Sequence, residues 1–111
     1  MNRNSTFIEL TDASFDENVL RRKAAILVVI CAEWSGACHI LRRTLKQFAA
    51  HLKNRFTIGY LDIDTNERTA KEYGVHELPI LLFYKNGELQ DHIAGLVPKR
   101  QLKNKLETFC E

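Results

Sequence analysis

The fold is decided by the stretch AILVVICAEWSGACHIL, residues 25–41. Its first part, residues 25–31, is an unbroken apolar run rich in β-branched side chains. A run this short and this branched predicts a strand that is buried on both faces. From Ile40 onward apolar residues recur at helical spacing to about Lys53, so a helix is expected next. Because the working site of such a sheet lies where a strand ends and a helix begins, we expect it at residues 34–38.

Strands and helices are expected to alternate on both sides of this stretch. Before it we expect a strand at 7–10 and a helix through Arg22, capped by Thr11 and Asp12. After it we expect a strand at 56–63 and then a short helix that is capped at 64–66 and stopped by Gly74. Two strands at 79–84 and 89–94 should follow, joined by an Asn86-Gly87 turn. A last helix should begin at Pro98. The order β-α-β-α-β-α-β-β-α predicts an α/β fold with a mixed sheet of about five strands flanked by about four helices.

Length and charge narrow the class of protein. The chain has 111 residues and a mass of 12.8 kDa, which is typical of one domain spanning 1–111. A net charge of +2 is too small to indicate nucleic-acid binding. No apolar run approaches the roughly 20 residues that span a bilayer, and residues 1–6 lack the apolar core of a signal peptide. We therefore expect a cytoplasmic monomer that binds neither nucleic acid nor membranes.

Several segments occur together at the spacing of a known family. Residues 32–38 (AEWSGAC) are similar to an active-site segment Ala-Glu-Trp-Cys-Gly-Pro-Cys, and residues 74–79 (GVHELP) are similar to the segment with a cis-proline, here Pro79. Residues 61–64 and 83–88 are similar to the third strand and the late hairpin, and Gly95 matches a glycine beside a peptide groove. Over nearly its whole length the chain resembles the thioredoxin family. The resemblance implies a thioredoxin-like fold.

The motif departs from the family at the position of its attacking cysteine. That position is Ser35, the motif proline is Ala37, and the second cysteine is present as Cys38. Thiol–disulfide exchange in this family needs a first thiolate that attacks and a second thiol that releases the product. A serine hydroxyl neither ionises near neutral pH nor forms a disulfide. The resemblance therefore implies that the two-step cycle does not run through Ser35 and Cys38.

Two further departures agree with this expectation. The family's buried acid corresponds to Val29, and its partner lysine corresponds to Tyr60. In the family this pair is associated with proton transfer at the second cysteine. Its loss is expected where fast dithiol turnover is no longer selected.

Ser35 and Cys38 leave more than one interpretation open. Ser35 is a preferred helix N-cap; the alternative is a nucleophile with His39 as its base. Cys38 is expected to be an inert buried thiol, or a one-thiol redox site. A metal site that joins Cys38 to His39 or His76 lacks converging ligands, so no metal and no cofactor are expected.

Cys31 is the third candidate. It lies two residues after Val29 on the predicted strand, so both side chains share one face. By the resemblance that face meets the motif helix, and Cys31 is then able to approach Cys38 as an unusual pair. The alternative is a small buried hydrophobe, which is how a free cysteine usually behaves.

The resemblance also implies a peptide groove. Its residues here are Trp34, Gly36, Ala37, Leu78, Pro79 and Gly95. We expect a protein that binds peptide or protein partners there without dithiol turnover. The alternative is thiol–disulfide redox through Cys38, alone, with Cys31 or with an external thiol. If the protein is an enzyme, it is then an impaired, monothiol oxidoreductase.

Overall fold

The structure is a computed structural model that describes residues 7–51, 56–74 and 77–110. These residues contain five strands: β1 (Phe7–Leu10), β2 (Ala25–Cys31), β3 (Thr57–Asp62), β4 (Ile80–Lys85) and β5 (Glu88–Ala94). The helices are η2 (Asp16–Leu20), α1 (Gly36–His51), α2 (Glu67–Glu72) and α3 (Lys99–Phe109). The predicted order of elements is confirmed.

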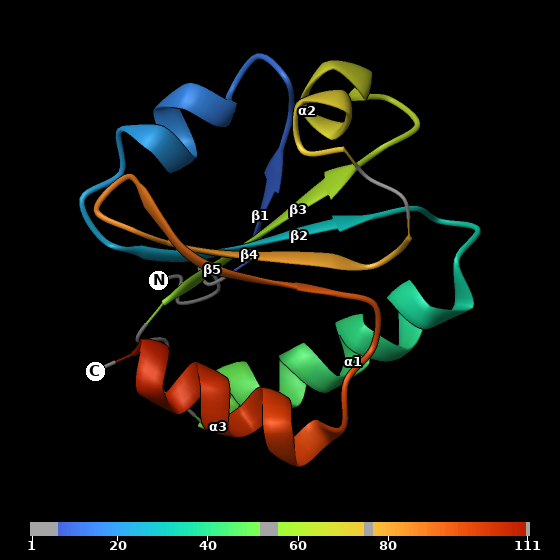
Figure 1. The fold of residues 1–111 in the computed structure, drawn as a ribbon, viewed down its shortest axis with the longest axis vertical. Helices are drawn as coiled ribbons and strands as arrows, with labels where there is room; N and C mark the ends of the chain where they lie inside the picture. Colours follow the sequence, from blue (N-terminus) through green and yellow to red (C-terminus); the bar gives the residue numbers. More distant parts are fainter. Residues whose placement is uncertain (1–6, 52–55, 75–76, 111) are drawn as a thin grey trace.

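The strands form one mixed sheet with the order β1-β3-β2-β4-β5. β1, β3 and β2 run parallel, whereas β4 is antiparallel to β2 and β5 is antiparallel to β4. Helices α1 and α3 cover one face of the sheet, and η2 and α2 cover the other (Figure 1). The central strand β2 thus ends between two helical layers, where α1 begins.

The apolar run of β2 supplies the core on both faces. Its residues from Ile26 to Ile30 are completely buried. Leu27, Val29 and Cys31 belong to the core under α1 and α3, and the alternate side chains of β2 belong to the core under η2 and α2. Burial of each such side chain contributes about 1.5–3 kcal/mol relative to exposure. This explains why the run forms the middle of the sheet.

The Asn86-Gly87 turn between β4 and β5 is as predicted. Asn86 has φ 53° and Gly87 has φ 80°, the left-handed geometry that a tight hairpin requires. At Gly87 a Cβ atom would also lie 2.3 Å from the backbone oxygen of Leu20, so the hairpin passes too close to η2 for any side chain.

The predicted caps of the two short helices are correct in position but only partly in the bonds they make. Thr11 Oγ1 accepts a hydrogen bond from the Ser14 N–H at 3.0 Å in the turn before η2, whereas Asn66 occupies the N-cap position of α2 without a side-chain cap bond. Instead the Asp12 carboxylate accepts hydrogen bonds from the backbone N–H groups of Thr69 (2.9 Å) and Arg68 (3.2 Å) in the first turn of α2. Asn66 Oδ1 accepts a bond from the Asp12 N–H at 2.8 Å. The cap of α2 is therefore supplied by Asp12, which is distant from α2 in the sequence, and not by a residue next to the helix.

Candidate functional site

Ser35 caps helix α1. Its Oγ accepts a hydrogen bond from the backbone N–H of Cys38 at 3.2 Å, and its own N–H donates to the Ala32 carbonyl at 3.2 Å. The first bond satisfies one of the amide groups that have no partner inside the helix. The hydroxyl of Ser35 is thus occupied in holding the first turn of α1.

His39 is bound away from the Ser35 hydroxyl. Its Nε2 lies 2.6 Å from the backbone carbonyl oxygen of Glu33. Because a carbonyl only accepts, Nε2 carries the proton and donates it there. This geometry does not support a Ser35 nucleophile with His39 as its base. His76, the other histidine of the metal alternative, lies outside the described residues.

Trp34 lies exposed beside the start of α1. Its side chain is 68% exposed, yet its indole Nε1–H donates to Oδ2 of Asp64 at 3.0 Å. The Asp64 backbone N–H in turn donates to Oδ1 of Asp62 at the end of β3, at 2.9 Å. This role of Asp64 could not be predicted from the sequence, because no local pattern links it to a tryptophan 30 residues earlier.

The segment opposite the motif contains the predicted cis-proline. The Leu78-Pro79 peptide bond is cis, and the carbonyl of Pro79 accepts a hydrogen bond from the Gly95 N–H at 2.7 Å. Gly95 has φ 82°, and a Cβ there would lie 2.6 Å from a carboxylate oxygen of Glu77. The structure therefore ties Pro79 and Gly95 together. Trp34, Gly36 and Ala37 come from the separate motif segment.

Cys31 and Cys38 are brought together behind the motif. Each is only 4% exposed, and both belong to the core under α1. The two thiols are neighbours, and both are free. Burial, and then the neighbouring Cys38 thiol, raise the pKa of Cys31 well above its usual range, so Cys31 keeps its proton at neutral pH. The proximity predicted from the shared strand face is confirmed.

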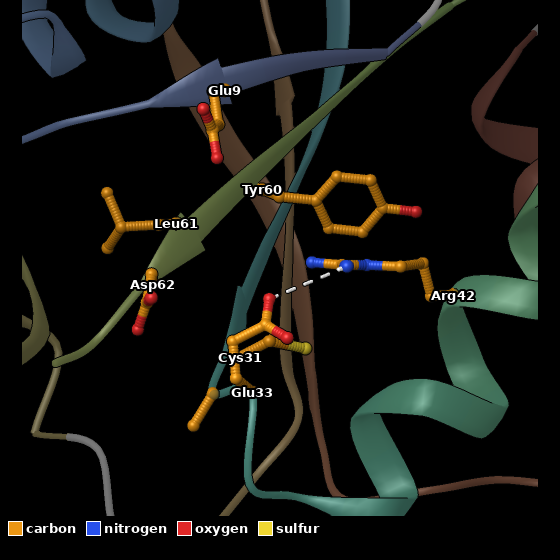
Figure 2. A pocket seen from close by; sticks show the side chains of 8 residues that line it. Glu9, Cys31, Glu33, Arg42, Tyr60, Leu61 and Asp62 are labelled. Atoms are coloured by element: carbon orange, nitrogen blue, oxygen red, sulfur yellow. Dashed lines mark ion pairs between the residues drawn. The ribbon is translucent and has the colours of Figure 1, made fainter. Parts of the chain in front are cut away.

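A small pocket opens beside Cys31. It has a volume of about 30 Å³ and lies between β1, β3, the end of β2 and α1, as Figure 2 shows. Arg42 reaches into it from α1: its guanidinium lies 4.6 Å from the ring centroid of Tyr60 and 3.8 Å from the Glu33 carboxylate. The position of Arg42 could not be predicted from the sequence, because only the fold places this residue opposite β3.

Tyr60 of β3 lies beside the central strand β2. The register of β2 and β3 pairs it directly with Val29, so neither residue of this pair is charged at neutral pH. Burial raises the pKa of Tyr60 to about 12, against a smaller opposing effect of Arg42. The Tyr60 hydroxyl is buried and has no hydrogen-bond partner within the described part of the chain.

Within residues 7–51, 56–74 and 77–110, no cluster of three or more His, Cys, Asp or Glu side chains is placed to hold a metal ion. No described helix is both long and apolar enough to cross a membrane.

Comparison with known proteins identifies the family of the chain. A family model described as Thioredoxin matches residues 6–108. This chain belongs to the thioredoxin family. It is 36% identical over 104 residues to a thioredoxin of Buchnera aphidicola subsp. Baizongia pistaciae, covering 94% of this chain and 95% of that protein.

Two further thioredoxins are similar to this chain as well. A thioredoxin of Synechocystis sp. is 32% identical over 91% of this chain and 94% of its own length. The chloroplastic M-type thioredoxin of Pisum sativum is 33% identical over 90% of this chain and 58% of its own. The α/β fold described above is the thioredoxin-like fold.

Proposed function

We propose that this thioredoxin-family protein binds extended peptide or protein partners and does not turn over disulfides through its motif. The binding surface is the groove predicted from the motif and cis-proline segments, formed by Trp34, Gly36, Ala37, Leu78, Pro79 and Gly95. The observation that supports this most directly is the state of Ser35. Its side chain is a hydroxyl that caps α1, so it serves the fold at the position where exchange chemistry needs a thiolate.

The geometry of the groove residues supports binding. Trp34 is the largest exposed apolar side chain of the motif, and its bond to Asp64 holds the indole in one orientation. An aromatic anchor that is already ordered loses little conformational entropy when a partner covers it. On the other segment, the Gly95 N–H holds the Pro79 carbonyl in place. An extended chain between the two segments would meet one ordered aromatic ring and one ordered backbone.

Binding can be tested without thiol chemistry. A fluorescein-labelled, cysteine-free, unfolded polypeptide is titrated with the protein, and the dissociation constant is read from anisotropy. Trp34→Ala is expected to weaken binding roughly tenfold, the loss typical of a buried aromatic anchor. Leu20→Ala is the matched control, because Leu20 is 43% exposed but lies on η2. No binding by the unmodified protein, or equal losses in both variants, would overturn the proposal.

A second candidate function is thiol–disulfide exchange through Cys38. It is favoured by one observation, the contact of Cys38 with a second thiol. The two functions are separated by insulin reduction with dithiothreitol as donor. We expect no rate enhancement from the unmodified protein. Enhancement that disappears in Cys38→Ala would contradict this expectation and would make Cys38 a working thiol.

A further inference from the structure

We infer that Cys31 and Cys38 are the site of a reversible intrachain disulfide, formed when hydrogen peroxide enters the pocket between β1, β3, the end of β2 and α1. This inference goes beyond the proposed function: it needs the neighbouring thiols of Cys31 and Cys38, and neither groove binding nor disulfide exchange with a partner protein. The pocket and the groove share no residue.

Both cysteines lie on secondary-structure elements whose backbone is held by hydrogen bonds. Cys31 is the last residue of β2 and is paired with Asp62 of β3. Cys38 lies in the first turn of α1, where its N–H is bound to Ser35. The two thiols are neighbours in the core under α1, and a disulfide requires their sulfur atoms to approach to roughly 2 Å. A disulfide between Cys31 and Cys38 would therefore link the end of β2 to the start of α1.

The pocket limits which oxidant can reach the pair. Each cysteine is 4% exposed, so neither meets a large molecule at the surface. Cys31 lines the pocket, and its volume of about 30 Å³ has room for a molecule of about the size of water. Hydrogen peroxide is of this size, whereas glutathione disulfide is many times larger. The Arg42 guanidinium, which lines the pocket and lies over the Tyr60 ring, supplies hydrogen-bond donors to the entering peroxide (Figure 2).

The reaction consumes one peroxide and releases two waters. The Cys31 thiolate attacks a peroxide oxygen, so an S–O bond forms and the O–O bond breaks. The departing hydroxide takes up the proton that Cys31 released and leaves as water. The Cys38 sulfur then attacks the sulfenic sulfur of Cys31, so the S–S bond forms and the S–O bond breaks. The second hydroxide takes the Cys38 proton, and the two electrons lost by the sulfurs have reduced the peroxide.

The rate is expected to rise with pH, because the thiolate is the attacking species. Charged and titratable groups surround Cys31 on several sides. They are Cys38 and Arg42 of α1, Tyr60 and Asp62 of β3, Glu9 of β1, and Glu33, which lies two residues after Cys31 in the chain. Burial outweighs the favourable charge of Arg42 and raises the pKa of Cys31. The site is therefore expected to oxidise slowly at neutral pH and faster in alkaline solution.

Mass spectrometry tests the inference directly, because trypsin leaves both cysteines on one peptide. Residues 24–42 contain Cys31 and Cys38, whereas Cys110 falls on the separate peptide 106–111. The folded protein is treated with hydrogen peroxide, blocked with iodoacetamide and digested. We expect peptide 24–42 to lose two hydrogens and to escape alkylation, and dithiothreitol added before blocking to restore it. Digestion after Glu33 should leave its two halves joined.

Matched variants identify the sulfurs. Cys31→Ala and Cys38→Ala should each abolish the loss of two hydrogens, and Cys110→Ala should leave it unchanged. If instead peptide 24–42 stays alkylated, or gains oxygen without losing hydrogens, the inference is overturned. Equal reaction with glutathione disulfide would overturn the part that assigns access to the pocket. Cys38-dependent insulin reduction without the internal disulfide would leave the second candidate function standing and remove only this inference.

Discussion

At the scale of single residues, Ser35 combines a structural role with a chemical consequence. A serine hydroxyl at the start of α1 accepts a hydrogen bond from the helix backbone, and a thiol there would do so only weakly. The same hydroxyl forms no disulfide. The Ser35 oxygen therefore stabilises the start of α1. In the function proposed here, it also stands in place of the thiolate that would attack a disulfide.

Ser35→Ala is expected to destabilise the protein by about 1 kcal/mol, the usual cost of losing an N-cap. The free energy of unfolding is measured by urea denaturation. Ser35→Asn is the control, since its side chain also caps helices, and it should retain most of the stability. If Ser35→Ala and Ser35→Asn are equally stable, the bond to the Cys38 N–H contributes nothing.

At the scale of elements, α2 depends on a residue from the other end of the chain. Asp12 follows β1, and its carboxylate binds two backbone amides and the Thr69 hydroxyl of α2. A negative charge at a helix N-terminus is also favoured by the helix dipole. These bonds, with the one from the Thr69 hydroxyl foremost, lower the pKa of Asp12 below its ordinary value of 3.8. Asp12 therefore fastens α2 to the end of β1.

This linkage predicts a loss of stability in acid. Because the pKa of Asp12 is lower in the folded protein, the folded state binds its proton less tightly than the unfolded chain. The resulting stability is present above the unfolded pKa and is lost as pH falls through the folded pKa. Urea denaturation from pH 6 downward is expected to show this decline below about pH 4. Asp12→Asn should have a smaller decline, and an unchanged decline would contradict the assignment.

At the scale of the whole molecule, β2 connects two cores. Leu27 and Val29 pack under α1 and α3, and the side chains between them pack under η2 and α2. The site begins where this strand ends, at Cys31 and the motif. A loss of packing in either core should therefore affect the same cooperative unit, including the first turn of α1.

Leu27→Ala is expected to cost about 2–5 kcal/mol, because it leaves a cavity at a completely buried position. That is a large part of the roughly 5–15 kcal/mol by which a domain of this kind is stable. Urea unfolding is followed by far-UV circular dichroism and by fluorescence of Trp34, the single tryptophan of the chain. The two transitions should coincide at a lower midpoint. Loss of the Trp34 signal at a separate midpoint would show that the motif unfolds independently.

Much of the fold could be predicted from the sequence alone, because it is encoded over short distances. Apolar periodicity indicated the strands and helices, Asn86-Gly87 indicated the hairpin, and the resemblance around Pro79 indicated the cis bond. Ser35 could be assigned as a cap because the helix it begins is its own neighbour in the chain. Each of these features depends on residues a few positions apart.

The tertiary structure decided the features that join distant segments. Asp12 caps α2 from 57 residues away, Asp64 holds Trp34 across 30 residues, and Arg42 stacks on Tyr60 between α1 and β3. For Cys31 the sequence determined only on which face of the strand its side chain lies. Cys31 contacts Cys38 because α1 packs on that face. Local patterns specify which side of an element is buried. Which residues then meet depends on how the elements pack, because the register and crossing of distant segments leave no periodic signal in either one.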